Sequence, residues 1–397
     1  MIRKWDAVAA LVCSALLLGG CWDAIPIEEL AYVSSIGLDL GQAPGTIALS
    51  LAIVNPVLAQ SPGSTAGGGG GGSAQAPYYV LTTEGTTVGE ALQLASEETP
   101  RRIFLGEVQA VVFGRTLAQQ GVGRVLDDLW RIPEMRPAVL TFAAVGSAKE
   151  VLEAGSVLEP LPHNTFLGLA QQPIAAAVEG VRLSDVQDYL TEPGIDPAMP
   201  LVGVDCAHAS AIPAKAGVLT CSGGAAPEVQ EVGTALFDGD RLVNTLTGAG
   251  SEPLRWLMSS RAGSDVAVTL PSGLLWVRIE QVSHRLRVLD EPGGLRVLLE
   301  LSVEAVLRGV EPQGPVMTES LLRSWQDDVA AQVQTSVAAT LRRTLADRVD
   351  PLGIGWWVEE NLPAVWGTVR ADWRSELPRL DAAVRVQVQI RNVGLVR

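Results

Sequence analysis

The chain has 397 residues, which is enough for two or three domains that each bury a sizeable core. Hydrophobic residues make up 47% of the chain and charged residues 18%, and this composition excludes a wholly disordered protein. The formal net charge of −15 repels phosphate backbones, so we expect no nucleic-acid partner. Because there are only three histidines and four cysteines, we expect neither a metal site nor a cofactor.

Residues 1–20 are predicted to be an export signal. A positive start at Arg3 and Lys4 is followed by an apolar run at 7–18 that is too short to span a bilayer comfortably. The run ends in Leu18-Gly19-Gly20-Cys21, which resembles a bacterial lipobox, and such a signal implies a diacylglycerol on the Cys21 thiol. An ordinary cleaved signal followed by a coincidental cysteine is the alternative. We therefore expect lipidation at Cys21, which would anchor the protein to the outer face of a bacterial membrane.

The segment 22–200 is predicted to be an N-terminal domain in which strands and helices alternate. The predicted strands cover residues 31–38, 46–54, 78–83, 103–113 and 139–145. The predicted helices cover residues 87–95, 117–130 and 148–154. Residues 59–76 contain six consecutive glycines but lack the lysine that a phosphate loop requires, so the sequence predicts a flexible loop there.

A middle domain with a junction insertion is predicted at 201–262. The stretch 190–230 has little periodicity and is rich in Pro, Gly and Ala, which is typical of a junction. It is followed by two short strands on either side of the turn Asp238-Gly239-Asp240, which predicts a hairpin.

The C-terminal domain is predicted at 263–397, with strands over residues 266–270, 274–280, 284–289, 295–306 and 384–390. A long helix is predicted at 320–349. Its apolar residues recur every fourth position, so the apolar stripe winds around the helix; this favours a helix that curves around a sheet or meets different partners at its two ends. Short helices are predicted at 356–360 and 363–373. The fold class is therefore predicted to be α+β, elongated and multi-domain, with mixed or antiparallel sheets packed by helices.

Short motifs spread over almost the whole chain carry a family resemblance. They are Cys21-Trp22-Asp23, Ile36-Gly37-Leu38-Asp39, Asn55-Pro56, Gly233-Thr234-Ala235-Leu236-Phe237, Asp350-Pro351-Leu352-Gly353-Ile354-Gly355, and the tryptophans Trp366 and Trp373. On these residues the chain resembles the GerAC-type, or Ger(x)C, lipoproteins, which are C subunits of the nutrient germinant receptors of bacterial spores. It departs from the family in its glycine tract, in its few lysines and in the insertion that holds Cys206 and Cys221.

The resemblance implies a function as well as a fold. It implies three α+β domains in an elongated, lipid-tethered subunit that is not an enzyme and whose motif residues are structural. It also implies partnership with a multi-pass A subunit and a multi-pass B subunit in the spore inner membrane. That complex senses nutrients and triggers spore germination.

Cys206 and Cys221 are the cysteines that remain after signal cleavage and lipidation. A disulfide between them would close a loop and contribute about 3 kcal/mol in the chain-entropy model. The alternative is that Cys206 and His208 act as a nucleophile and its base, although no third residue orients such a pair.

Other functions are weighed against the receptor subunit. A solute-binding lipoprotein of a transport system would favour two similar lobes around a cleft, whereas the two halves of this chain differ in pattern. An exported hydrolase would need a motif such as G-x-S-x-G or H-E-x-x-H, and neither occurs. The C-terminal tryptophans favour core packing, with a partner surface as the alternative, and they are Trp356, Trp357, Trp366 and Trp373.

Overall fold

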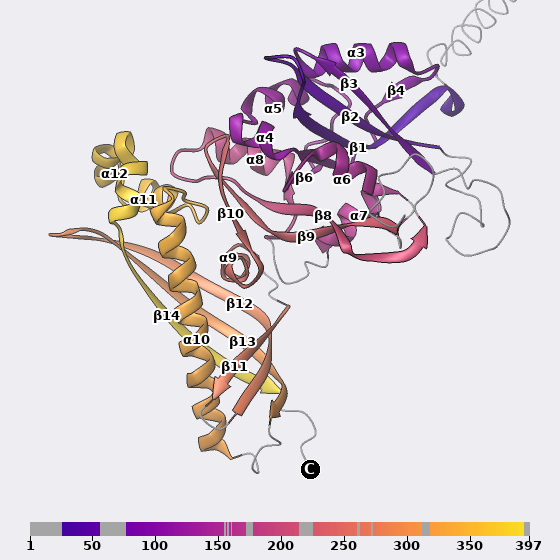
Figure 1. Cartoon of the computed structure of the whole chain (residues 1–397). Coiled ribbons are helices and arrows are strands. Elements are labelled where there is room, and N and C mark those ends of the chain that lie inside the picture. Colours follow the sequence, from indigo (N-terminus) through magenta and orange to yellow (C-terminus); the bar gives the residue numbers. More distant parts are fainter. Residues whose placement is uncertain are drawn as a thin grey trace, which may run out of the picture.

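The computed structural model describes residues 26–55, 77–154, 156, 159, 161–171, 178–213, 225–259, 263–270, 273–311 and 318–392. Within these residues, a sheet of ten strands and a sheet of four strands organise the chain into two halves (Figure 1). This confirms the predicted elongated α+β fold, in which helices pack on the sheets. No helix in these ranges is long and apolar enough to cross a membrane.

The larger sheet has the strand order β10-β9-β8-β6-β5-β1-β2-β3, with β4 added beside β1 and β7 beside β6. Its strands are β1 (Leu30–Leu40), β2 (Ile47–Val54), β3 (Tyr78–Gly85), β4 (Arg102–Phe104), β5 (Ala110–Phe113), β6 (Leu140–Ala144), β7 (Val181–Arg182), β8 (Ala198–Pro213), β9 (Ala225–Asp238) and β10 (Arg241–Thr247). The helices of this half are η1 (Ile27–Glu29), α3 (Val88–Glu98), α4 (Arg115–Gln120), α5 (Gly123–Trp130), α6 (Ala148–Ala154), α7 (Pro162–Gln171) and α8 (Leu183–Thr191).

The segment 201–262, predicted as a middle domain, supplies most of β8 and all of β9 and β10 to this larger sheet. The connection is made by β6 and β8, which pair in parallel through Ala143 with Leu201 and Ala144 with Val202. Backbone hydrogen bonding therefore runs continuously across the larger sheet from β3 to β10. The domain limits predicted at 200/201 and 262/263 stay a prediction.

Two predicted elements are each split in the structure. The helix predicted at 117–130 is interrupted between α4 and α5, because Gly121 adopts a φ of 133° that a helix cannot contain. The strand predicted at 103–113 becomes β4 and β5, which pair in parallel with successive parts of β1. Conversely, the two strands predicted between 274 and 289 merge into one long strand, β12.

The smaller sheet has the order β11-β12-β13-β14, and its strands are β11 (Ser264–Leu270), β12 (Gly273–Glu291), β13 (Gly294–Glu311) and β14 (Asp381–Asn392). Neighbours are antiparallel except β13 and β14, which run parallel. The helices of this half are η2 (Gly248–Gly250), α9 (Glu252–Met258), α10 (Glu319–Ala346), α11 (Ile354–Asn361), α12 (Pro363–Val369), η3 (Arg370–Asp372), α13 (Trp373–Glu376) and η4 (Leu377–Arg379).

Helix α10 lies across one face of the smaller sheet (Figure 1). Its apolar residues are buried at every fourth position from Trp325 to Leu345, which is the winding stripe that the sequence predicts. Two glutamines of α10 also bind the backbone of both edge strands. Gln326 Oε1 accepts the N–H of Ile390 in β14 at 3.0 Å, and Gln332 Nε2 donates to the carbonyl of Ala267 in β11 at 2.8 Å. The apolar stripe winds around the helix because α10 contacts the β14 edge of the sheet near Gln326 and the β11 edge near Gln332.

Candidate functional site

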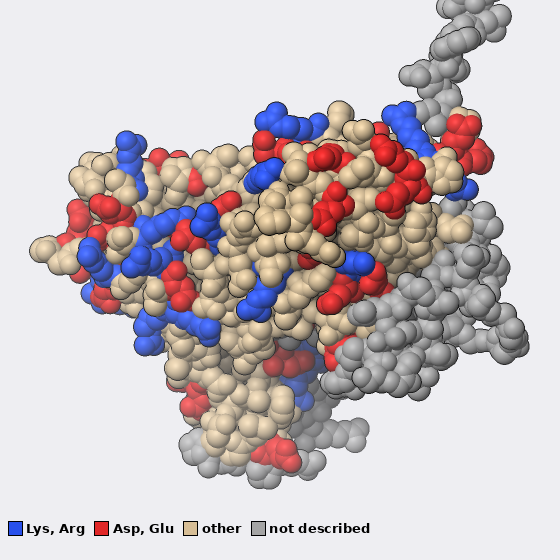
Figure 2. All heavy atoms as spheres, turned by 45° about the horizontal axis from the view of Figure 1, so that its top comes forward, with Lys and Arg blue, Asp and Glu red and all other residues tan. Residues whose placement is uncertain are grey.

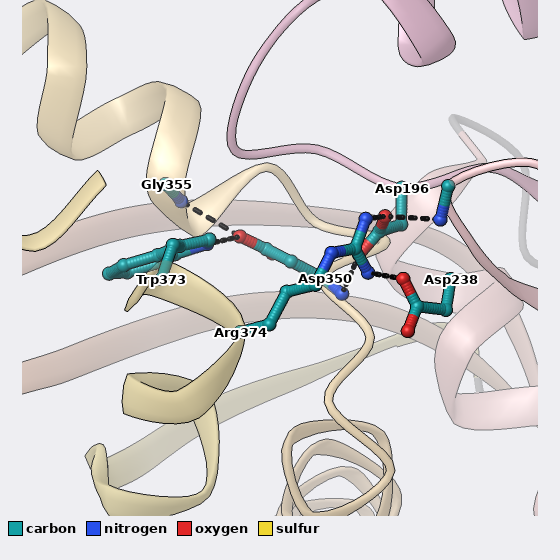
Figure 3. A network of polar contacts seen from close by, with 7 residues as sticks. Asp196, Asp238, Asp350, Gly355, Trp373 and Arg374 are labelled. Atoms are coloured by element: carbon teal, nitrogen blue, oxygen red, sulfur yellow. Dashed lines mark hydrogen bonds and ion pairs between the residues drawn. The ribbon is translucent and has the colours of Figure 1, made fainter. Parts of the chain in front are cut away.

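The two halves meet at a polar network that we call the joint (Figure 3); its residues are Gly194, Asp196, Asp238, Asp350, Gly355, Trp373 and Arg374. The backbone N–H of Asp196, just before β8, donates to the carbonyl of Asp350 at 2.9 Å. In return, the backbone N–H of Asp350, just after α10, donates to Oδ2 of Asp196 at 2.9 Å. Two hydrogen bonds of opposite direction therefore fasten one half to the other.

The carboxylate of Asp350 caps the start of helix α11. Its Oδ1 accepts the N–H of Ile354 at 2.8 Å, and its Oδ2 accepts the N–H of Gly355 at 2.8 Å. Trp373 adds a third donor, with Nε1 at 3.3 Å from Oδ2. The residue is 1% exposed, and this burial raises the pKa of the Asp350 carboxyl to about 7, although the three donors act in the opposite direction.

The carboxylate of Asp196 gathers groups from both halves. Its Oδ1 accepts the N–H of Gly239 at 3.0 Å and a hydrogen bond from Arg374 Nη2 at 2.8 Å. Arg374 also forms an ion pair with Asp238, so one guanidinium from the C-terminal half bridges two carboxylates of the larger-sheet half. Because Arg374 is partly exposed and Asp196 is buried, the stabilisation comes mainly from the buried hydrogen bonds of Asp196.

Two glycines let the backbones of the two halves touch. A Cβ placed on Gly355 would lie 2.6 Å from the Cα of Gly194 and 2.6 Å from Nε1 of Trp373. Gly194 is itself left-handed, with a φ of 78°, and its carbonyl accepts the N–H of Trp356 at 2.9 Å. The predicted motif residue Gly353 has a φ of 67° and sets the entry to α11. In the sequence Gly353-Ile354-Gly355, the first glycine therefore adopts the left-handed backbone conformation, and the second allows the close contact with Gly194.

The C-terminal tryptophans divide between core and surface. Trp366 and Trp373 are buried, and their rings meet edge to face with centroids 5.4 Å apart. Trp356 is 46% exposed on α11, whereas Trp357 is partly buried against the core of the smaller-sheet half.

The remaining described motif residues stabilise the larger-sheet half. Asp39 accepts the backbone N–H groups of Ala148 and Lys149 at 2.9 and 3.0 Å, and so caps the start of α6. Phe237 is fully buried in the core, and Asn55 closes β2 by donating its N–H to the carbonyl of Pro77 at 2.8 Å. Gly37 and Gly233 allow close packing: a Cβ on Gly37 would lie 3.1 Å from Leu152, and one on Gly233 would collide with the carbonyl of Leu246.

Several predicted residues lie outside the described part of the chain; they are Cys21, Trp22, Asp23, Pro56 and Cys221. The backbone of Cys206 and His208 belongs to β8, but their side chains also lie outside it. The lipid on Cys21, the disulfide and the Cys206–His208 pair therefore stay predictions.

A cleft of about 460 Å³ opens beside the joint. One wall is the end of α8 with the segment up to Asp196, and the other is Trp366 with residues 370–375. Among the described residues, no group of three or more His, Cys, Asp or Glu side chains could hold a metal ion. The hydrogen bonds and the close glycine contact of the joint provide a firm connection between the two halves.

Sequence reasoning found one side of the joint and missed the other. The motif residues Gly355 and Trp373 belong to the joint, and Gly353 lies beside it. Asp196, Gly194 and Arg374 went unnoticed, because they stand outside any periodic pattern. The only local signal was the Gly-x-Asp sequence at 194–196, which is common in turns.

Comparisons with known proteins cover nearly all of the chain. Residues 23–204 match the family described as "Spore germination protein N-terminal domain", and residues 232–394 match "Spore germination B3/ GerAC like, C-terminal". The chain is 26% identical over 413 residues to spore germination protein KC of Bacillus subtilis (strain 168), with 100% of this chain and 97% of that protein covered. It is 21% identical over 406 residues to spore germination protein B3 of the same strain, with 96% of each covered.

A solved structure shares the fold. The crystal structure of the GerBC protein aligns with a TM-score of 0.57 and 14% sequence identity, and the alignment covers 90% of this chain and 97% of that one. The fold likeness and the order of the two matched domains agree with one another. The chain belongs to the GerAC-type family of spore germination proteins.

Proposed function

We propose that this chain is the lipid-anchored, non-enzymatic C subunit of a spore nutrient germinant receptor. In this proposal it acts with multi-pass A and B subunits at the outer face of the spore inner membrane and is needed for nutrient-triggered germination. The observation that carries the proposal is the match to both GerAC-type domains, in order, over residues 23–394. Relatives that align over nearly the whole chain are named as spore germination proteins.

The chemistry of the motif residues supports a role without catalysis. The carboxylates of Asp39 and Asp350 are each occupied by backbone N–H groups at helix starts, so they hold the fold together. Trp366 and Trp373 are buried, and Gly355 is a packing position. Residues with such roles fix the shape of a subunit, which is what a receptor component needs in order to present a constant surface to its partners.

A solute-binding lipoprotein of a transport system is the second candidate. The cleft of about 460 Å³ between the two halves has the size of a small-molecule site and favours this candidate. The architecture favours the receptor subunit, because one half contains a ten-stranded sheet and the other a four-stranded sheet, whereas two similar lobes are expected around a solute.

Spores and growing cells that lack the gene distinguish the two candidates. For a receptor subunit, nutrient-triggered release of dipicolinic acid from the spores is lost, while uptake of labelled nutrients by growing cells stays normal. For a transport protein, uptake of one solute is lost and spore germination proceeds. Loss of uptake with normal release would reject the proposal.

A further inference from the structure

The smaller sheet has a second face that helix α10 does not cover. Along β12 and β13, one set of alternating side chains is buried against α10, including Val277 and Leu299. The other set points away from α10; it is mostly exposed on β12 and mostly half-buried on the central strand β13. Cross-strand register places these residues in rows, one of which is Arg285, Glu300 and Arg385 on β12, β13 and β14. We call this surface the open face; its charged and exposed apolar residues are Asp265, Trp276, Arg278, Arg285, Arg287, Leu289, Glu291, Arg296, Glu300, Glu304, Arg308, Asp381, Arg385 and Arg391.

The middle of the open face carries more arginines than acidic residues, with three arginines around one glutamate. Arg285, Arg287 and Arg385 are exposed, and none of them forms an ion pair within the described residues, although Glu300 lies between two of them in register. Elsewhere on the face the arginines are paired: Arg278 reaches Asp265 at 3.3 Å. Cross-strand neighbours of opposite sign stabilise a sheet, so the three arginines without an ion pair are not explained by the stability of the sheet.

Charge on the rest of the molecule makes this patch distinctive. The net charge of the chain is −15, and most of that excess belongs to residues 1–262. Figure 2 shows red side chains predominating on the right of the view, where the larger-sheet half lies. A partner with an acidic surface would therefore be repelled by the larger-sheet half and attracted to the open face, which fixes its orientation.

Exposed apolar side chains accompany the arginines. Trp276 is 43% exposed and stands opposite Ala267 on one neighbouring strand and Gly309 on the other, so small residues leave its ring accessible. Leu289, near the tip of the β12–β13 hairpin, is 41% exposed. Tryptophan and arginine are the residue types that contribute most of the binding energy in protein–protein interfaces.

We infer that the open face is the docking surface for an acidic, water-exposed surface of the receptor's membrane-embedded subunits. This inference rests on the proposed function. Arg285, Arg287 and Arg385 supply the charge that attracts and orients the partner, and Trp276 supplies the apolar anchor at the other end of the face.

The test is co-purification from spore membranes. The lipidated full-length chain carries an affinity tag, and the A and B subunits encoded with it are measured by quantitative blotting. In the test variant, Arg285→Gln, Arg287→Gln and Arg385→Gln are combined. The matched control combines Arg101→Gln, Arg343→Gln and Arg370→Gln, which are exposed arginines on other elements. We expect the test variant to retain about tenfold less of the A and B subunits, and the control to retain the wild-type amount. Trp276→Ser should weaken retention even at a salt concentration that screens the charges.

The possible outcomes separate the two claims. Equal retention by the wild type and the test variant would overturn the docking surface and leave the proposed function intact. A control variant that loses as much as the test variant would also overturn it, because a general charge effect would then explain the loss. Failure of the wild type itself to retain A and B subunits would overturn both claims.

Discussion

Asp196 and Asp350, which are 154 residues apart, hold each other's backbone through reciprocal hydrogen bonds of 2.9 Å. One belongs to the half built on the ten-stranded sheet and the other to the half built on the four-stranded sheet (Figure 3). Each carboxylate also organises its own surroundings, Asp350 by capping α11 and Asp196 by binding Gly239 and Arg374. The pair makes the two halves depend on each other for stability.

Asp196→Ala should therefore destabilise the chain as a whole. The change leaves the buried N–H of Asp350 without an acceptor and removes one carboxylate from Arg374, so we expect a loss of about 3 kcal/mol in the free energy of unfolding. Urea unfolding followed by tryptophan fluorescence measures the loss. Asp238→Ala is the control: its ion pair with Arg374 is partly exposed, so its loss should cost less than about 1 kcal/mol. If Asp196→Ala cost no more than Asp238→Ala, the joint would not couple the two halves.

Close contact at the joint predicts that Gly355 tolerates no side chain. Gly355→Ala would place its Cβ 2.6 Å from Gly194 and from the Trp373 indole, so we expect a cost of about 2–3 kcal/mol in unfolding free energy. Gly367→Ala on α12 is the matched control, because its Cβ would meet nothing within 4 Å. In the control, removing a helical glycine should stabilise the chain by about 0.5–1 kcal/mol. Calorimetry should show a lower melting temperature for Gly355→Ala and a higher one for Gly367→Ala than for the wild type. Equal shifts of the melting temperature in the two variants would contradict the close contact at Gly355.

The buried carboxyl of Asp350 and the partly buried carboxyl of Glu231 predict that stability falls as pH rises through neutrality. Burial raises the pKa of Asp350 to about 7 and that of Glu231 to about 8; nearby Arg255 opposes the second shift. Since both folded-state values exceed those of the unfolded chain, folding takes up protons. The stabilisation is fully present below about pH 4 and is lost as pH rises to about 7 for Asp350 and 8 for Glu231.

The variant Glu231→Gln tests this pH dependence, because it keeps the shape of the side chain and cannot titrate. Between pH 6 and 8 its unfolding free energy should fall less steeply than that of the wild type, by up to about 1.4 kcal/mol per pH unit. Glu98→Gln, the same substitution at an exposed glutamate near the end of α3, serves as the matched control. Identical slopes for Glu231→Gln and the wild type would show that Glu231 does not take up a proton on folding.

The proposed lipid anchor predicts where the protein is found. Cys21→Ala should move the protein from the membrane pellet to the soluble fraction and weaken nutrient germination, because in this proposal acyl chains on Cys21 supply the membrane affinity. Cys13→Ala changes the other cysteine of the amino-terminal segment and should leave the protein in the pellet. Fractionation followed by blotting measures both, and retention of the Cys21→Ala protein in the membrane would contradict lipid anchoring at this residue.

Local patterns in the sequence predict the elements but not their meeting points. Thr87 caps α3 with its hydroxyl, which accepts the N–H of Glu90 at 3.1 Å, and the Thr-x-x-Glu spacing is a local sequence signature of such a cap. The alternation of β14 and the winding stripe of α10 were equally visible, because they are periodic. The break at Gly121 was not, since helix propensity around it hid a single left-handed residue.

The joint needed the three-dimensional structure for a physical reason. Asp350 belongs to a recognisable motif, because a proline and two glycines follow it in the sequence. The sequence around Asp196 gives no indication that Asp196 is the partner of Asp350. Their contact is set by how the connector before β8 passes the end of α10, which is a tertiary outcome. The open face could not be predicted from the sequence for a related reason. Its charged side chains come from three strands, and only the register between these strands shows which of them are neighbours.

The most direct test of the account is the release of dipicolinic acid from spores in which this gene and its paralogues are deleted. Such spores are exposed to a panel of nutrients and to a non-nutrient trigger, with and without a restored copy of this gene. The account predicts that restoring the gene recovers release for particular nutrients, while the non-nutrient trigger works in every strain. Normal release on every nutrient in the strain without the gene would contradict a role for this chain in nutrient germination.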